Sequence, residues 1–163
     1  MNKVYLSLGS NRGERQGNLS KAIILLNKQA GKVVSLSSLY ETQPWKMEDD
    51  TNFINQVVLL ETALDANTLM DCILEIETLM GRIRTAAKYE PRIIDIDILF
   101  FNNDVVSSEK LTIPHPFIQE RLFVLAPMVE ISPDYIHPIL KTKIYQLLSV
   151  CKDHSRVVKL VLK

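Results

Sequence analysis

Two aspartates alternate with isoleucines in residues 91–101, which read PRIIDIDILFF. Because successive side chains of a strand point to opposite faces, Asp95 and Asp97 would share one face, with their Cα atoms roughly 7 Å apart. Aspartate is uncommon in strands, and two neighbouring carboxylates repel unless a positive charge lies between them. Carboxylate oxygens are the ligands that hard divalent cations prefer. The pair predicts a metal site, because a solvated polar face on an edge strand explains one aspartate better than two.

The same alternation sorts the apolar side chains of this segment. It places Leu99 and Phe101 on the face of the aspartates. The opposite face would carry Ile94, Ile96, Ile98 and Phe100.

A cluster of basic side chains precedes the aspartates, with Tyr89 among them: Arg82, Arg84, Lys88 and Arg92. Such a loop is often only a solvated surface. Here arginine outnumbers lysine, which suits a bidentate grip on phosphate oxygens, and guanidinium groups beside Mg²⁺ are typical of phosphoryl transfer. We therefore expect residues 82–92 to bind phosphate, and to be mobile until ligands order them.

Other motifs indicate less about chemistry. The turn at residues 9–13 lacks the Lys-Ser/Thr ending of a phosphate-binding P-loop. No local signature supports a Ser–His or Cys–His dyad. His115 lies between Pro114 and Pro116, where a structural loop histidine and a phosphate donor are about equally good interpretations, and Arg121 is a candidate for the same anion.

The composition predicts a single globular domain over residues 1–163, with 47% apolar and 23% charged residues. A net charge of zero provides no global field for nucleic acid or an acidic membrane. We expect no signal peptide, because residues 1–3 lead directly into the strand-like residues 4–8. We also expect no membrane span, because no apolar run approaches about 20 residues. Cys72 and Cys151 are expected to be buried reduced thiols. These features predict a cytoplasmic protein.

Periodicity and turn residues predict the elements that position these groups. Asp65 is a candidate N-cap and Gly81 a candidate C-terminal stop of one helix. Strand and helix patterns alternate without Gly-rich turns after strands, which favours an α+β fold over a doubly wound parallel sheet. The expected strands are 3–8, 33–42, 53–62, the aspartate strand and 157–162, and the expected helices are 18–29, 65–80, 117–130 and 142–151.

Taken in order, these motifs resemble those of the 6-hydroxymethyl-7,8-dihydropterin pyrophosphokinases of folate biosynthesis, along essentially the whole chain. The segment around Asp95 and Asp97 is the most specific match, and the early glycine turn is weak alone. The other matching segments are residues 9–11, 40–42, 52–55, Glu77 with 81–84, 114–116, and Arg121 with Phe123.

The resemblance implies a ferredoxin-like, mainly antiparallel sheet with helices packed on it in three αβα layers. It implies transfer of the β,γ-diphosphoryl group of ATP to the hydroxymethyl oxygen of the dihydropterin, with release of AMP. ATP would be the co-substrate and two Mg²⁺ ions the cofactors. The partners would be these small molecules alone, and we expect a monomer.

The resemblance also implies roles for individual residues. Catalysis would rest on Arg82, Arg92, Asp95 and Asp97, the two aspartates holding the metal. The nucleotide pocket would comprise Glu77, Arg84, Lys88, Tyr89, Ile98, His115 and Arg121. The pterin would contact Thr42, Gln43, Trp45, Phe53, Asn55, Asp95 and Phe123, although core packing is the commoner role of a phenylalanine.

Two other classes share part of this pattern. A nucleotidyltransferase also combines a Gly-Ser turn with an Asp-x-Asp strand, but there the two lie close in sequence, whereas here Gly9 and Asp95 are far apart. A non-catalytic ferredoxin-like module that senses a nucleotide would have no reason to place a carboxylate pair beside four cations. AMP as product would distinguish the pyrophosphokinase from both.

Overall fold

The computed structural model describes residues 1–43, 51–83 and 92–161. Elements follow the chain in this order: β1 (Asn2–Ser10), α1 (Arg15–Gln29), β2 (Lys32–Leu36), β3 (Tyr40–Thr42), β4 (Phe53–Thr62), α2 (Ala66–Leu79), β5 (Asp95–Phe101), β6 (Val106–Ser107), β7 (Thr112–Ile113), the 3-10 helix η1 (Ile118–Glu120), α3 (Leu122–Ile131), α4 (Ile144–Ser149) and β8 (Val157–Lys159).

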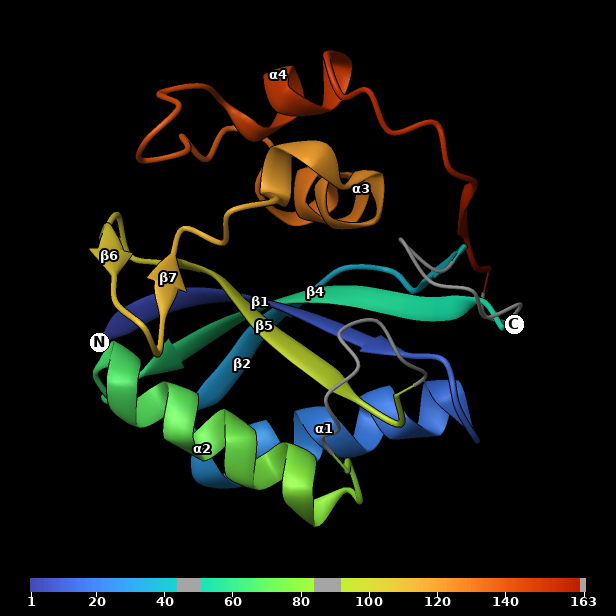
Figure 1. The fold of residues 1–163 in the computed structure, drawn as a ribbon, viewed down its shortest axis with the longest axis vertical. Helices are drawn as coiled ribbons and strands as arrows, with labels where there is room; N and C mark the ends of the chain where they lie inside the picture. Colours follow the sequence, from blue (N-terminus) through green and yellow to red (C-terminus); the bar gives the residue numbers. More distant parts are fainter. Residues whose placement is uncertain (44–50, 84–91, 162–163) are drawn as a thin grey trace.

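The main sheet has the strand order β5-β1-β4-β3-β8, and β2 also pairs with β4. All of these described pairs are antiparallel. Helices α1 and α2 cover one face of the sheet, while α3 and α4 lie over the other (Figure 1). This arrangement confirms the predicted α+β fold with three αβα layers.

Each face of the sheet has its own hydrophobic core. Leu6, Leu26 and Ile73 belong to the core on the side of α1 and α2. Val57 and Leu125 belong to the core on the side of α3 and α4. Because side chains alternate along every strand, Val4, Leu6 and Leu8 of β1 enter the first core, and Tyr5, Ser7 and Gly9 lie on the α3 side.

One transverse row of the sheet crosses five strands. Asp95 of β5 pairs with Gly9 of β1, which on its other side pairs with Asn55 of β4. Asn55 pairs in turn with Tyr40 of β3, and Tyr40 with Lys159 of β8. Directly paired residues of a sheet share a face, so this row places the side chains of Asp95 and Asn55 on the same surface with only a glycine between them.

The predicted strand 33–42 is in fact two strands, and this expectation was wrong. Ser37 interrupts the ladder: its backbone N–H donates to the carbonyl of Val57 at 2.9 Å, and its Oγ accepts the N–H of Val57 at 3.0 Å. A serine side chain that takes the place of a backbone partner competes with regular pairing. The chain therefore leaves β4 after Leu36 and rejoins it as β3.

The predicted faces of Phe100 and Phe101 are exchanged. The pairing of β1 with β5 shifts between Tyr5 and Leu6, so that Tyr5 is opposite Phe100 and Leu6 opposite Ile98. Leu99 is the extra residue of this bulge, and bulges reverse the alternation beyond them. Phe100 accordingly packs in the α3 core and Phe101 in the α1–α2 core.

The boundaries of α2 agree with the sequence at both ends. The Asp65 side chain accepts the N–H of Thr68 at 2.8 Å, and Gly81 follows α2 with φ +91°, a conformation that favours glycine. Both cysteines are free thiols, as predicted, but they are only partly buried, because Cys72 and Cys151 pack at the edges of the two cores.

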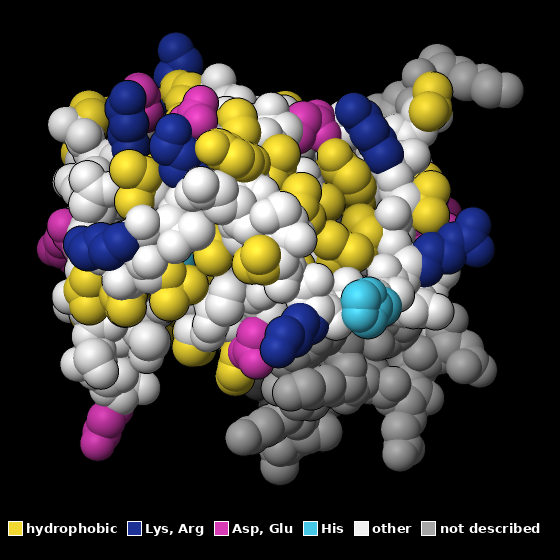
Figure 2. All heavy atoms as spheres, turned by 90° about the horizontal axis from the view of Figure 1, so that it is seen from above, with side chains coloured by type: hydrophobic (Ala, Val, Ile, Leu, Met, Phe, Trp, Pro, Cys, Tyr) yellow, Lys and Arg dark blue, Asp and Glu magenta, His cyan; other side chains and the backbone are white. Residues whose placement is uncertain are grey.

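The surface over α4 mixes apolar and charged groups. Figure 2 shows this face from above, with hydrophobic side chains lying between lysines, arginines and acidic residues. The exposed apolar side chains of residues 136–150 are Ile136, Ile139, Leu140, Tyr145 and Val150. No helix within the described residues is long and apolar enough to cross a membrane.

Candidate active site

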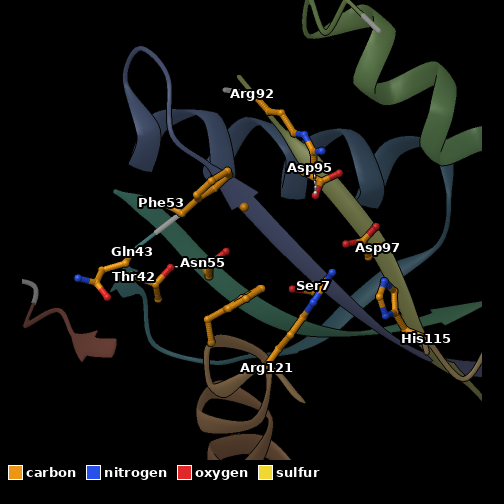
Figure 3. A pocket seen from close by; sticks show the side chains of 12 residues that line it. Ser7, Thr42, Gln43, Phe53, Asn55, Arg92, Asp95, Asp97, His115 and Arg121 are labelled. Carbon is orange, nitrogen blue, oxygen red and sulfur yellow. Dashed lines mark hydrogen bonds and ion pairs between the residues drawn. The ribbon is translucent and has the colours of Figure 1, made fainter. Parts of the chain in front are cut away.

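A cleft lies where the ends of β1, β4 and β5 meet the start of α3. Figure 3 shows its two sides: Arg92, Asp95, Asp97 and His115 gather near β5, and the aromatic and amide side chains face them from β3 and β4. The lining residues are Ser7, Gly9, Thr42, Gln43, Phe53, Asn55, Arg92, Asp95, Asp97, His115, Arg121 and Phe123. Ten of these are predicted site residues, so widely separated segments converge as expected.

Asp95 is held by two arginines. Its Oδ1 lies 2.9 Å from Nη1 of Arg82, and its Oδ2 lies 2.8 Å from Nη1 of Arg92. All three side chains are largely buried, so the pairs are less screened by water than surface ion pairs are. In this state the guanidinium groups that could grip phosphate are bound to a carboxylate at the edge of the cleft.

Asp97 lies one pleat further along β5, opposite Ser7 of β1. Burial raises the pKa of Asp97 to about 7, and the neighbouring charge of Asp95 adds to this shift, while Arg121 and Arg92 oppose it. The nearby arginines therefore do not fully compensate the second carboxylate. A ligand that brought positive charge would be attracted to this position.

His115 provides a neutral hydrogen-bond donor. Its Nδ1 accepts the backbone N–H of Phe117 at 3.1 Å, so the neutral ring carries its proton on Nε2. Burial lowers the pKa of His115 to about 4, and the positive charge of Arg121 acts in the same direction. The imidazole is thus uncharged at neutral pH, with one N–H to offer toward the cleft.

Arg121 and Phe123 enter the cleft from the start of α3. The guanidinium of Arg121 lies 5.1 Å from the ring centre of Phe117 and 5.6 Å from that of Phe123, within the range of cation–π attraction. Figure 3 shows Arg121 reaching from α3 toward Ser7 and the β5 side. One helix terminus therefore supplies both a cation and an aromatic ring.

Asn55 and Thr42 form the polar part of the opposite side. The Asn55 amide donates from Nδ2 to Oγ1 of Thr42 at 2.6 Å, and both residues are buried. This bond fixes the orientation of the amide, leaving its Oδ1 as an acceptor near Gly9 and Phe53. A buried amide held in one orientation can recognise the polar edge of a flat heterocycle.

The carboxylate pair fits a hard divalent cation. Within the described part of the chain, no group of three or more His, Cys, Asp or Glu residues could hold a metal. Mg²⁺ usually takes only one or two carboxylates and completes its shell with water and substrate phosphates. Asp95 and Asp97, on one strand face with the pKa of Asp97 raised, match that donor set.

Three predicted residues do not line the cleft: Glu77, Arg82 and Ile98. Glu77 is 2% exposed: its Oε1 accepts the N–H of Ile96 at 2.9 Å and its Oε2 pairs with Arg82 at 2.8 Å. It thereby joins α2 to β5 and orients Arg82. Ile98 was expected in the nucleotide pocket, but its side chain points into the α1–α2 core, so only its backbone could contact a ligand there.

Four further predicted residues lie outside the described residues: Trp45, Arg84, Lys88 and Tyr89. The expected mobility of the loop 82–92 falls largely on the same part of the chain and stays a prediction. Sequence reasoning missed Ser7 and gave Gly9 no role in the cleft. A glycine inside a strand pattern, which marks a close approach of another group, was the available signal for Gly9.

A three-layer α+β fold that brings a carboxylate pair, arginines and an amide-and-aromatic slot into one cleft defines an enzyme of the phosphoryl-transfer class. The family described as 7,8-dihydro-6-hydroxymethylpterin-pyrophosphokinase matches residues 5–133. The chain belongs to this family, which confirms the predicted family and enzyme class.

Similar proteins come from bacteria and eukaryotes. A 2-amino-4-hydroxy-6-hydroxymethyldihydropteridine pyrophosphokinase of Bacillus subtilis is 43% identical over 131 residues, covering 80% of this chain and 78% of the relative. The folic acid synthesis protein fol1 of Schizosaccharomyces pombe is 44% identical over 139 residues, covering 84% of this chain. The match spans only 19% of that longer protein.

Solved structures share the fold. A Plasmodium falciparum HPPK-DHPS crystal structure superposes with a TM-score of 0.75 at 22% identity, covering 91% of this chain and 43% of the other. At that identity the likeness establishes the fold alone, and it agrees with the three-layer architecture described above.

Proposed function

We propose that this chain transfers the β,γ-diphosphoryl group of ATP to the hydroxymethyl oxygen of 6-hydroxymethyl-7,8-dihydropterin. The hydroxyl oxygen loses its proton and forms a bond to the β-phosphorus, the bond from that phosphorus to the α–β bridging oxygen breaks, and AMP leaves. The observation that carries the proposal is the row Asp95–Gly9–Asn55, which sets an anion-handling side and a heterocycle-binding side next to each other on one sheet surface.

Asp95 and Asp97 would hold two Mg²⁺ ions, which when bound supply charge neutralisation and fix the phosphate oxygens. Arg82 and Arg92 already lie at the same carboxylate, 2.9 and 2.8 Å from its oxygens. Phosphate oxygens compete well for guanidinium groups because they accept two parallel hydrogen bonds. We infer that both arginines exchange a contact with Asp95 for contacts with the triphosphate, assisted by the cation of Arg121 and the N–H of His115.

The pterin would lie between Phe53 and Phe123, with its polar edge on Asn55 and Thr42. Offset aromatic stacking favours a flat ring between two phenylalanines. The fixed amide of Asn55 offers an acceptor to the N–H groups of that edge. This arrangement would direct the hydroxymethyl group of the substrate toward the β5 side of the cleft.

We propose that the protein acts as a monomer. We also propose action in the cytoplasm, where ATP is available. The substrates are small molecules, and the net charge of zero gives no reason to invoke nucleic acid.

Product analysis tests the proposed function directly. The protein is incubated with ATP, Mg²⁺ and the reduced hydroxymethylpterin, and the nucleotide products are separated by chromatography. We expect AMP and the pterin diphosphate in equal amounts. A nucleotidyltransferase would release pyrophosphate instead, a simple kinase would release ADP, and a binding module would leave ATP unchanged.

Replacing Phe123 with alanine is expected to weaken binding of the pterin more than binding of ATP. A lost aromatic stack costs roughly 0.5–1.5 kcal/mol beyond the buried area, or about two- to thirteenfold in affinity. Calorimetric titration of each ligand would measure the two losses separately. Equal losses would show that Phe123 serves only to pack the protein.

Gly9→Ala is expected to weaken pterin binding about tenfold, by displacing the Asn55 amide from its hydrogen bond. A Cβ at Gly9 would lie 2.8 Å from Oδ1 of Asn55, closer than such atoms approach in proteins. Gly17→Ala on α1 is the matched control, since its new Cβ would meet the Glu14 Cβ at an ordinary 3.6 Å. Unchanged pterin affinity in the Gly9 variant would contradict the proposed role of Asn55.

A further inference from the structure

We propose that Glu130, which does not line the cleft, is a positioning residue that sets the width of the pterin slot by tying α3 to β3. The inference rests on the proposed function, because it concerns the two sides of the slot assigned to the pterin. Phe123 stands on α3, whereas Thr42 stands on β3 and Asn55 and Phe53 stand on its neighbour β4.

Glu130 is bonded to the β3 region through both carboxylate oxygens. Its Oε2 accepts the hydroxyl of Tyr40 at 2.6 Å, and its Oε1 accepts the backbone N–H and the Oγ hydroxyl of Ser38 at 2.7 and 2.8 Å. The Nζ of Lys159 lies 3.8 Å from Oε2. Four donors from β3, β8 and the segment before β3 thus converge on one side chain of α3.

The protonation states of Tyr40 and Glu130 favour a stable hydrogen bond between them. Burial raises the pKa of the Tyr40 hydroxyl, and the carboxylate of Glu130 raises it further, so the phenol stays protonated as a donor. Burial alone would raise the pKa of Glu130, but the hydrogen bonds from Tyr40 and Ser38 lower it overall. Charged hydrogen bonds of this kind are stronger than neutral ones.

Tyr40 belongs to the transverse row that also carries the site. It pairs directly with Asn55, and two residues further along β3 Thr42 accepts the Asn55 amide and pairs with Phe53. A contact that holds Tyr40 therefore holds the strand segment that orients Asn55. Loss of the Glu130 contact would therefore affect the pterin slot through the paired residues Tyr40 and Asn55.

On the helix, Glu130 is seven residues after Phe123. Seven residues make almost two full turns, so the two side chains project from the same face of α3, roughly 10 Å apart along its axis. The start of α3 is bonded to the C-terminal segment, where Asp153 Oδ2 accepts the Leu122 N–H at 2.9 Å. The Glu130 carboxylate instead joins α3 to the strand region that bears Thr42.

The test compares Glu130→Ala and Glu130→Gln with the wild type. Pterin affinity is titrated in the presence of a saturating non-hydrolysable ATP analogue, and affinity for the analogue is titrated alone. We expect Glu130→Ala to weaken pterin binding about tenfold and analogue binding less than twofold. Glu130→Gln keeps the length of the side chain but replaces one acceptor oxygen with an NH₂ donor, so it should recover only part of the pterin affinity.

Asp134→Ala is the matched control, because this exposed carboxylate lies four residues beyond Glu130 and pairs with Lys143 at 3.5 Å. It should leave both affinities unchanged. Should Glu130→Ala fail to fold, Tyr40→Phe removes a single hydroxyl of the same contact and is expected to weaken pterin binding about threefold.

Two results would overturn the inference while leaving the proposed function intact. One is a folded Glu130→Ala protein with wild-type pterin affinity. The other is an equal loss for pterin and analogue, which would indicate a general loss of stability. Absence of pterin binding by the wild type would instead contradict the proposed function itself.

Discussion

Asp97→Asn is expected to abolish measurable turnover while stabilising the free protein at neutral and alkaline pH. The loss of activity follows from the proposed metal site: removing one of two carboxylate ligands should lower kcat by roughly 10³-fold or more, a typical effect of losing charge stabilisation in a transition state. The gain in stability follows from the raised pKa of Asp97, which shows that its ionisation is unfavourable in the folded protein.

The pH dependence of this gain has a definite sign. Below the ordinary pKa of 3.8 the carboxyl is neutral in both the folded and the unfolded chain, and the variant should differ little from the wild type. Between there and about 7 the folded wild type holds a proton that the unfolded chain releases, so its stability falls as pH rises. Asparagine does not titrate, and above that range its advantage should level off on the order of 2–4 kcal/mol.

Asp95→Asn is the matched comparison. It should also inactivate the enzyme, but it removes one partner from two ion pairs, with Arg82 and Arg92, and so should lower the unfolding free energy. Chemical denaturation at pH 5 and pH 8 measures both effects. If Asp97→Asn were no more stable than the wild type at pH 8, the electrostatic account of this pair would fail.

The different surroundings of Asp95 and Asp97 show which features of the site could be predicted from the sequence and which could not. Alternation along a strand suffices to place Asp95 and Asp97 on one face, because side-chain direction in a strand depends only on position. Which carboxylate is compensated depends on Arg82 and Arg92, whose side chains reach Asp95 from outside its strand. Arg82 is 13 residues before Asp95 and Arg92 only 3, and neither spacing indicates which of the two carboxylates the arginine contacts.

The same distinction between local patterns and long-range partners applies to the fold. Strand 53–62 and the Asp65 cap follow from local patterns and were confirmed. The break between β2 and β3 and the bulge at Leu99 depend on pairing with neighbouring strands, which a pattern along one segment does not contain. The proposed role of Glu130 could not be predicted from the sequence either, since its contact with Tyr40 forms only when α3 packs against β3.

Arg92→Ala is expected to lower kcat by about 10²–10³-fold while raising the Kd for ATP less than tenfold. In the free protein the guanidinium is bound to Asp95, so it contributes little to the first encounter with the nucleotide. Its contact with the transferring phosphates would form only when that ion pair is exchanged. An interaction made late in this way affects kcat more than binding.

Backbone hydrogen bonds to Asn11 hold the chain at Arg92, so the variant should lose the side chain without a local change of the backbone. The Arg92 N–H donates to Oδ1 of Asn11 at 2.6 Å and its carbonyl accepts the Asn11 N–H at 3.0 Å, so the chain remains anchored when the side chain is removed. Arg92→Lys keeps the charge but not the planar fork, and should recover only part of kcat. Single-turnover kinetics with ATP titrations separate the two parameters. A variant in which Kd rises as much as kcat falls would show that Arg92 binds ATP equally in the ground state, and that no exchange with Asp95 precedes the chemistry.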